Sequence, residues 1–447
     1  MGLSAKTSRR KFLGNTAAIG AIGAIGAGQL IRACSSENKT GPVEAPVMPD
    51  RAPEGIPLKA GVVGCGGRGT GAAFNFLNAG PDLSITAVAD IFQDRIDEIR
   101  KKLKDEKGVT LDDASCFTGF DAYKRLLETD VDVVILATPP YFRPEHFQAC
   151  VEARKHVFME KPVAVDPVGA RSVMAASKQA EAAGLTVITG TQRRHQRDYN
   201  HVLARIKAGM IGEIVASNVY WNQSKLWHRE KQSAWTEMEF MLRDWVNWIW
   251  LSGDHIVEQH IHNIDVSNWF LGKVPVEAVG VGSRQRRLTG DCYDNFSVDF
   301  VYDQKVHMHS MCRQINDCAN NVSEHLRGTK GYTNCASTIW DPEGNPLYTY
   351  EDPVDENGES TVNNGYDQEH VDLVTAIRTG EQIVEAEETA RTNLTAIMGR
   401  QAAYTGKNIT WDDMMGSGLK LGPAGPLTLG PVDVRALIPV PGSAPEA

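Results

Sequence analysis

The stretch LKAGVVGCGGRGTG at residues 58–71 decides the fold predicted for this chain. A short apolar run leads directly into Gly64-Cys65-Gly66-Gly67-Arg68-Gly69, which has the spacing GxGxxG. The first glycine turns the chain off a strand, the second lets backbone approach a pyrophosphate, and the third lets a helix pack closely on the strand. The stretch therefore predicts a strand, a phosphate-binding turn and a helix over residues 67–79, whose free N–H groups would face the phosphates.

A carboxylate at the expected distance supports this interpretation. A second apolar run, residues 84–89, ends in Asp90, about twenty residues after the last glycine. There, a carboxylate accepts hydrogen bonds from an adenosine ribose. Because the chain has 41 glycines, chance matches to GxGxxG are expected, and Asp90 separates a dinucleotide site from a glycine-rich turn in another α/β unit. We predict that the cofactor is NAD, with Asp90 repelling the 2′-phosphate of NADP.

The composition limits the classes of partner. With 447 residues, of which 42% are hydrophobic, the chain is long enough for two domains with large cores. The net charge of −10 argues against a nucleic-acid partner, since no basic stripe follows roughly the first forty residues. The eight cysteines form no CxxC pair. Cys312 and Cys318 are candidates for a disulfide, and most of the others are expected to be buried small side chains.

The first 57 residues are expected to contain an export signal and a tether. Ser8-Arg9-Arg10-Lys11-Phe12-Leu13 matches a twin-arginine export signal, and a weakly apolar Gly/Ala stretch follows it. Residues 30–34 resemble a bacterial lipoprotein cleavage box, which makes Cys34 a candidate lipid anchor and the only expected contact with a membrane. Residues 1–34 are thus predicted to be a signal and the proline-rich residues 35–57 a tether. The predicted location is the periplasm or cell envelope.

Residues 58–190 are predicted to form a doubly wound parallel sheet, because short strands and helices alternate there. The expected strands are residues 60–63, 84–89, 131–137, 156–159 and 186–189. The expected helices are residues 67–79, 93–104, 121–128, 144–153 and 167–183.

Residues 191–410 are predicted to form a second domain with a large, open, mainly antiparallel sheet. Apolar and polar residues alternate in residues 214–220, 276–281, 296–302 and 305–311, as in half-buried strands. Helices are expected at residues 367–378 and 386–404. The Gly/Pro-rich residues 411–447 are expected to form a tail of loop structure.

Three further motifs carry a family resemblance. They are Ala137-Thr138-Pro139-Pro140 with His146 after it, Glu160-Lys161-Pro162, and Glu258-Gln259-His260-Ile261-His262. With the glycine loop, they resemble the glucose–fructose oxidoreductase and inositol dehydrogenase family (Gfo/Idh/MocA) over residues 58–410. The resemblance implies a Rossmann domain followed by an open-sheet α/β domain. It also implies oxidation of secondary hydroxyls of sugars, glycosides or cyclitols.

The resemblance also assigns roles to residues. It places proton transfer on Lys161 and His262, with Glu258 as the acidic partner. The chain departs from the family motif by having Glu rather than Asp at 258 and His rather than Gly at 260, so the His260 imidazole is expected to occupy space near the pocket. The expected cofactor-binding residues are Gly64, Gly66, Gly67, Arg68, Gly69, Asp90, Thr138, Pro139, His146, Glu160 and Lys161.

The residues themselves suit these roles. Removing hydride from a secondary alcohol leaves a proton, and histidine or a lysine of lowered pKa can accept it near neutral pH. Residues 258 and 262 are four apart and would share one face of a helix. The competing interpretation is a surface Glu–His pair with a solvated Lys161. The expected substrate-binding residues, chosen from a polar and aromatic population typical of a sugar pocket, are Arg194, Trp221, His255 and Asp254.

Alternatives to an exported dehydrogenase follow from the same residues. His255, Glu258, His260 and His262 are dense enough to suggest a metal, but on a helix His260 would point away from the others, so no metal site is predicted. The chain is also consistent with an NAD-dependent glycosidase acting through a keto-sugar, or with a non-catalytic carbohydrate-binding lipoprotein. The exposed face of the second sheet predicts a homodimer or homotetramer.

Overall fold

A computed structural model describes residues 45–354, 364–434 and 438–442 of the chain. The predicted signal, Cys34 and the first part of the predicted tether lie outside these residues. The described residues belong to one compact unit. Among the described residues, no helix combines the length and the apolar character needed to cross a bilayer.

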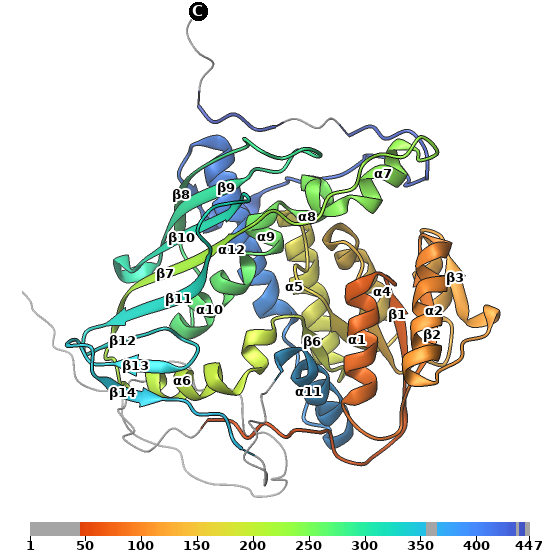
Figure 1. The fold of residues 1–447 in the computed structure, drawn as a ribbon, viewed down its shortest axis with the longest axis horizontal. Helices are drawn as coiled ribbons and strands as arrows, with labels where there is room; N and C mark the ends of the chain where they lie inside the picture. The colour runs from red at the N-terminus through yellow and green to blue at the C-terminus, as the bar shows by residue number, and fades with distance from the viewer. Residues whose placement is uncertain (1–44, 355–363, 435–437, 443–447) are drawn as a thin grey trace, which may run out of the picture. The chain divides into compact units, whose positions relative to one another are not determined.

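The first domain is a Rossmann domain, as predicted, with a six-stranded sheet in the order β3-β2-β1-β4-β5-β6. All neighbouring strands in it are parallel. Buried apolar strands with helices on both faces are the expected result of the alternating sequence pattern (Figure 1). Its elements are β1 (Leu58–Val63), α1 (Gly67–Asn78), β2 (Leu83–Asp90), α2 (Gln93–Lys107), β3 (Cys116–Thr118), α3 (Ala122–Leu127), β4 (Val133–Leu136), α4 (Arg143–Glu152), β5 (His156–Met159), α5 (Pro167–Ala182) and β6 (Val187–Thr189).

The second sheet has nine strands in the order β14-β13-β12-β11-β7-β10-β9-β8-β15. Its pairs are antiparallel except for β10 and β7, which run parallel. The strands are β7 (Ile214–Gln223), β8 (Glu277–Ser283), β9 (Asn295–Val301), β10 (His307–Gln314), β11 (Asn321–Gly328), β12 (Tyr332–Thr333), β13 (Thr338–Trp340), β14 (Pro346–Thr349) and β15 (Ile409–Thr410).

Helices cover one face of this sheet, with α10 and α12 in direct contact with its strands. The helices outside the Rossmann sheet are α6 (Arg197–Lys207), α7 (Glu237–Arg243), α8 (Ile249–Ser252), α9 (His255–Glu258), α10 (Ile261–Leu271), α11 (Gly365–Thr379), α12 (Ala386–Thr405) and α13 (Trp411–Gly416). Single turns of 3-10 helix occur at η1 (Asp113–Ser115), η2 (Pro140–Phe142), η3 (Gln192–His195), η4 (Trp245–Asn247) and η5 (Asp303–Lys305).

Two helices from late in the chain connect the domains. Although α11 falls within the stretch expected to form the second domain, its Val371 and Val374 are buried in the same core cluster as Val62 of β1. Helix α12 carries Asn393, whose Oδ1 accepts the backbone N–H of Val163 at 2.8 Å, just after β5. The carboxyl end of β5 is therefore held by the second domain.

The predicted tether is wrong for the residues that the structure describes in it. Ala52 is buried, and its N–H donates to the carbonyl of Ala79 at 2.7 Å. The Arg378 guanidinium on α11 donates to the carbonyls of Pro53 and Ile56. Residues 45–57 thus run along the domain, because their backbone groups find partners there.

The C-terminal stretch is partly irregular, as expected, but it begins with helix α13, which has a capping box formed by Thr410 and Asp413. After it, the tail crosses α8 and α7 (blue in Figure 1). Leu427 and Val432 pack against an apolar cluster that includes Met238 of α7. The tail therefore braces α7.

Candidate active site

The glycine loop between β1 and α1 has the geometry of a nucleotide cradle. Gly64 has φ +95°, a left-handed conformation that favours glycine. A Cβ on Gly69 would lie 1.8 Å from the carbonyl oxygen of Gly64, so only glycine lets α1 approach β1. Gly66 and Gly67 have no atom within 4 Å of such a Cβ, which leaves open space at the amino end of α1. The loop therefore fits a bound pyrophosphate.

A cavity of about 390 Å³ begins at this loop, and we call it the nucleotide cavity. It is lined by nine of the eleven predicted cofactor residues, namely Gly64, Gly66, Gly67, Arg68, Gly69, Asp90, Thr138, Pro139 and His146. The other two, Glu160 and Lys161, follow β5 and do not line it.

Asp90 is fixed at the carboxyl end of β2. Its Oδ2 accepts the N–H of Cys65 at 2.7 Å, and its Oδ1 accepts the N–H of Phe92 at 2.9 Å. Burial raises the pKa of Asp90, and these backbone N–H groups oppose that rise. Arg95 also lines the cavity and pairs with Glu98 at 3.0 Å. The carboxylate is thus fixed in the wall of the cavity by two backbone N–H groups.

The second domain contributes a cap to this cavity, which we define as Trp227, Arg229, Leu242, Arg243 and Trp245. Trp227 and Trp245 meet edge to face with ring centroids 6.2 Å apart. The cap is tied to the Rossmann domain by Arg243, whose guanidinium makes a bidentate pair with Asp94 at 2.9 and 3.0 Å. Sequence reasoning did not single out Trp227 or Arg229, although tryptophans crowd that part of the sequence.

Lys161 follows β5 and meets the second domain. Its Nζ donates to the carbonyl of Glu258 at 2.6 Å and lies 3.4 Å from Glu258 Oε1. Both side chains are largely buried, with 10% and 8% of their surface exposed. The neighbouring Glu160 is paired with Arg68 of the glycine loop. The expectation of a solvated Lys161 beside a surface Glu–His pair is therefore wrong.

His262 lies beside this pair, but not on the same helix. The predicted single helix is wrong, because α9 ends at Glu258 and α10 begins at Ile261. His262 is buried and stacks on Trp221 of β7, with ring centroids 5.7 Å apart. Burial, and after it the charge of Lys161, lowers the pKa of His262 well below its usual value. The imidazole is therefore neutral near pH 7.

The expectation that His260 occupies space near the pocket also needs correction. Its Nε2 is 2.8 Å from the Ser310 hydroxyl on β10, and the residue is completely buried. Burial lowers its pKa to about 3. The break between α9 and α10 turns this side chain into the sheet, where it supports the fold.

The four predicted substrate residues separate in the structure. Trp221 lies at His262, but the Arg194 guanidinium is held by Asp265 at 2.8 and 2.9 Å. Asp254 caps α9 by accepting the N–H of His255 at 2.6 Å, and both residues are buried. These three residues therefore serve internal contacts.

The arginine that lies beside Trp221 is Arg193, the immediate neighbour of the predicted Arg194. Its guanidinium lies 5.8 Å from the Trp221 ring and pairs with Glu324 at 2.6 Å. The prediction chose Arg194, and it was wrong because the short 3-10 helix η3 decides which of the two arginines faces β7.

Neither a metal cluster nor a disulfide occurs among the described residues. No group of three His, Cys, Asp or Glu side chains there is arranged to hold a metal ion. Cys312 is buried and Cys318 is exposed, and both are free thiols, so the disulfide considered between them is wrong.

Comparison with known protein families and curated proteins adds to this geometry. A model described as the NAD-binding Rossmann fold of an oxidoreductase family matches residues 58–189, and one for the C-terminal alpha/beta domain of the same family matches residues 204–411. Myo-inositol 2-dehydrogenase from Thermotoga maritima is 24% identical over 51% of this chain and 58% of that protein. A glycosyl hydrolase family 109 protein from Streptomyces coelicolor is 26% identical over 53% of each. The chain thus spans somewhat more than half the length of these relatives.

Solved structures share the fold. An aldose–aldose oxidoreductase from Caulobacter crescentus, crystallised with glycerol, has a TM-score of 0.62 at 17% identity, covering 79% of this chain and 100% of that one. A scyllo-inositol dehydrogenase from Lactobacillus casei with NAD(H) and scyllo-inositol has a TM-score of 0.59 at 19% identity, covering 79% and 99%. At these identities the likeness establishes the arrangement of the two domains.

Proposed function

The chain belongs to the Gfo/Idh/MocA family of oxidoreductases, and from this premise we propose that it oxidises a secondary hydroxyl of a sugar, glycoside or cyclitol with NAD. The observation that carries the proposal is the convergence of Lys161, Glu258 and His262 beside Trp221. An NAD-binding Rossmann domain supplies the cofactor site. When bound there, NAD supplies the hydride acceptor.

The chain's own residues account for the proton. His262 is neutral because its pKa is lowered, so its imidazole can accept the hydroxyl proton as the alcohol becomes a ketone. The Lys161 ammonium, fixed by Glu258, can donate a hydrogen bond to the same oxygen and stabilise charge that develops on it. Burial of these side chains keeps water away from the reacting atoms.

An aromatic and cationic wall supports a carbohydrate as the substrate. The Trp221 ring offers a flat apolar face for C–H groups of a sugar, and the Arg193 guanidinium beside it offers hydrogen-bond donors for hydroxyls. Relatives named for myo-inositol and for glycosyl hydrolysis fit the same substrate class.

A second candidate is an NAD-dependent glycosidase that works through a keto-sugar intermediate. The named glycosyl hydrolase relative favours it. The non-catalytic carbohydrate-binding lipoprotein is disfavoured, because a scaffold would have no need for a buried lysine tied to a carboxylate.

Export belongs to the proposal on the strength of the twin-arginine motif at residues 8–13. That route carries folded proteins, so we infer that the enzyme reaches the periplasm or cell envelope with NAD in place. Free NAD is absent there, so the nucleotide is retained through catalysis and re-oxidised in place. The hydride is taken back by a second sugar or ketone, by the same substrate after an intervening step, or by an external acceptor.

The test is to incubate the purified full chain with a panel of glycosides and cyclitols and to weigh the products by mass spectrometry. The bound NAD takes the hydride, so dehydrogenation is expected to give up to about one equivalent per chain of a product two hydrogens lighter. Lys161→Ala protein is expected to form that product about two to four orders of magnitude more slowly. Release of the aglycone together with an unoxidised sugar would favour the glycosidase. Unchanged masses throughout, with nucleotide bound, would favour the binding protein.

A further inference from the structure

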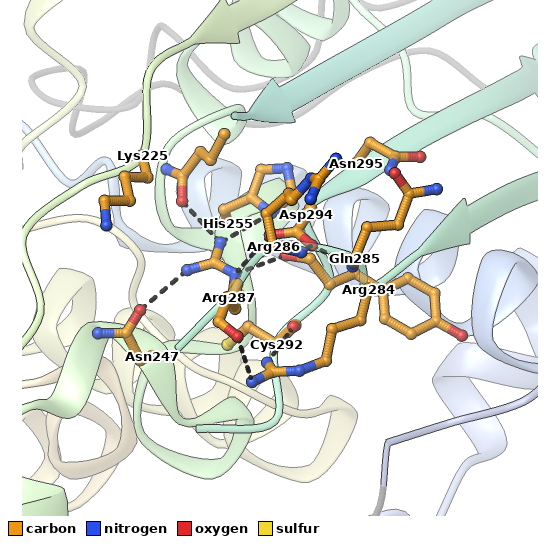
Figure 2. Close-up of polar contacts among 12 residues, drawn as sticks. Lys225, Asn247, His255, Arg284, Gln285, Arg286, Arg287, Cys292, Asp294 and Asn295 are labelled. Atoms are coloured by element: carbon orange, nitrogen blue, oxygen red, sulfur yellow. Dashed lines mark hydrogen bonds and ion pairs between the residues drawn. The ribbon is translucent and has the colours of Figure 1, made fainter. Parts of the chain in front are cut away.

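A second cavity, of about 420 Å³, lies at the carboxyl ends of β7 and β10. None of Lys161, Glu258 or His262 lines it. Figure 2 shows the polar framework at its base, centred on Arg287. The cavity is lined by Lys225, Leu226, His228, Asn247, Arg286, Arg287, Leu288, Asp294, Gln314, Ile315, Asn316, Asp317 and Cys318, and we call it the arginine cavity.

The arginine cavity adjoins the nucleotide cavity. Lys225 and His228 line the arginine cavity, whereas Trp227, between them in sequence, lines the nucleotide cavity. In the same way, Asn247 lines the arginine cavity and Trp245 lines the nucleotide cavity. The same two chain segments therefore form the wall between the two cavities.

The arginine cavity also continues the wall that carries Trp221. Cys312 on β10 pairs with Trp221 on β7, and Gln314 is the next residue of β10 on the same face. Two residues of a strand span about 7 Å. The base of the arginine cavity thus lies one side-chain position beyond the aromatic wall of the proposed active site.

The base of the arginine cavity is held in place because each nitrogen of the Arg287 guanidinium donates a hydrogen bond. The guanidinium donates to Asn247 Oδ1 at 2.9 Å, to Gln314 Oε1 at 2.6 Å and to the carbonyl of Tyr293 at 2.8 Å (Figure 2). Asp294 Oδ2 accepts the N–H of Arg286 at 2.6 Å. The side chains of Arg287 and Asp294 are 5% and 1% exposed.

Two polar atoms of this base have no hydrogen-bond partner among the described residues. They are Gln314 Nε2 and Asp294 Oδ1, on residues that are 2% and 1% exposed, with Asp294 Oδ1 3.8 Å from Arg287 Nε as an ion pair. Because Arg287 occupies Gln314 Oε1, the free atom of that amide is a donor. Buried polar atoms are rarely left unpaired. A donor and an acceptor on two residues that line the same cavity match a hydroxyl group, which is both.

The rim of the arginine cavity is cationic. Lys225 and Arg286 are exposed, and neither side chain is paired with a carboxylate in the part of the chain that the structure describes. The exposed Asp317 also lines the cavity, so two cations face one carboxylate there. Leu226 and Leu288 add apolar surface, and Leu288 is 68% exposed. A ligand that matches these groups carries a hydroxyl group, an apolar face and an anionic group.

We propose that the arginine cavity is a subsite for an anionic sugar unit, joined to the unit that is oxidised at Lys161 and His262. Gln314 and Asp294 hold a hydroxyl of this unit, and Lys225 and Arg286 hold its carboxylate or sulfate. The assignment deepens the proposed function and rests on it for the identity of the neighbouring site. The substrate class is therefore an acidic glycoside or oligosaccharide.

Calorimetric titration of the nucleotide-loaded full chain tests the subsite without turnover, with glucuronate, glucose 6-sulfate, glucose and inorganic sulfate as probes. We expect at least one of the two anionic sugars to bind about tenfold or more tightly than glucose and inorganic sulfate. The stronger of the two identifies the anion. Glucose or inorganic sulfate binding as tightly as both anionic sugars would overturn the proposal.

Variants locate the binding. The double variant Lys225→Ala/Arg286→Ala is expected to weaken the anionic sugar about tenfold or more. Lys231→Ala, in the same segment but lining neither cavity, is expected to change nothing. Gln314→Ala is expected to weaken the anionic sugar as well, and thermal melting checks that it folds. Binding unchanged in the surface double variant would overturn the proposal.

The Lys161→Ala protein separates this proposal from the proposed function. Retained binding of the anionic sugar in that variant is expected, because Lys161 does not line the arginine cavity. Loss of binding there, with the cavity variants unaffected, would place the sugar in the active site and overturn the subsite. If wild-type protein binds the anionic sugar but oxidises no glycoside in the panel, the proposed function fails and the subsite stands.

Discussion

The ammonium group of Lys161, at the end of a Rossmann strand, donates a 2.6 Å hydrogen bond to the main-chain carbonyl of Glu258 in the second domain. The lysine is therefore positioned by the docking of α9 as much as by its own strand. A main-chain acceptor cannot be removed by substituting the side chain of Glu258. The carboxylate, 3.4 Å away, contributes charge rather than position.

Replacing Lys161 by alanine is expected to lower turnover by about two to four orders of magnitude, the range for an acid–base group. Folding and nucleotide content are expected to remain, because the side chain does not line the nucleotide cavity. Single-turnover reduction of bound NAD, followed by its absorbance, measures the effect. The exposed Lys178→Ala serves as the control. Near-wild-type oxidation by the Lys161 variant would refute the catalytic assignment.

Stability is expected to fall as the pH drops below 6.5. Burial lowers the pKa of His370, whose ordinary value is 6.5, to about 3. Between these values the unfolded chain binds a proton that the folded chain does not, so acid favours unfolding by up to about 1.4 kcal/mol per pH unit. His370→Gln is expected to flatten the pH dependence of the unfolding free energy, measured with urea.

The control for that experiment is a variant that damages the same packing without removing an imidazole. Phe158→Leu alters the ring that lies 4.2 Å from His370. It is expected to lower stability by a similar amount at every pH. An equal change of slope in both variants would argue that packing, rather than protonation, sets the pH dependence.

Asp90→Ala is expected to relax the choice of nucleotide rather than abolish binding. Its carboxylate would repel the 2′-phosphate of NADP, and Arg95 lines the same cavity and would then attract it. Chromatography of nucleotide released by denaturation measures the ratio of NADP(H) to NAD(H). The exposed Asp97→Ala is expected to keep the wild-type ratio. Mostly NADP(H) in the wild-type protein would contradict the assignment.

Arg243→Ala is expected to make the enzyme lose its nucleotide. The bidentate pair with Asp94 ties the cap to the Rossmann domain, so removing it loosens the wall of the cavity. Wild-type protein is expected to retain close to one nucleotide per chain through dialysis, while the variant empties. Arg327→Ala, far along β11, provides the control. Wild-type protein that arrives empty, yet works with added NAD, would contradict tight retention.

The exposed face of the second sheet is expected to join copies of the chain. Val279 and Val281 on β8 are 52% and 67% exposed, and Met311 on β10 is 36% exposed on the same face. Val281→Asp is expected to shift a dimer or tetramer toward monomer in light scattering, because a carboxylate would be buried without a partner. Val47→Asp, at an exposed position outside the sheet, serves as the control. A wild-type monomer at micromolar concentration would refute this interface.

Local spacing was sufficient to predict the Rossmann half of the site. The glycine loop and Asp90 are read from short segments, and the cavity that they line has the residues expected of it. Strand β5 and the motif after it were predicted for the same reason, since buried parallel strands are continuous apolar runs.

Contacts between distant segments were beyond such reasoning. The break between α9 and α10 depends on burial of His260 against Ser310, which lies on a strand 50 residues away in sequence. The choice of Arg193 over Arg194 depends on a single turn of 3-10 helix. The cap over the nucleotide cavity depends on the pair of Arg243 with Asp94, 149 residues apart. No pattern within one element records these partners.

The bracing of α7 by the tail has a consequence for the order of events during synthesis. Residues 417–434 are synthesised after both sheets, and they pack against the helix that carries Leu242 and Arg243 of the cap. The cap on the nucleotide cavity therefore gains this support only after both sheets have been synthesised. A chain ending at residue 416 would keep both sheets and every predicted catalytic side chain. We expect it to bind NAD and to lose the nucleotide on dialysis, because its cap would lack the support of the tail.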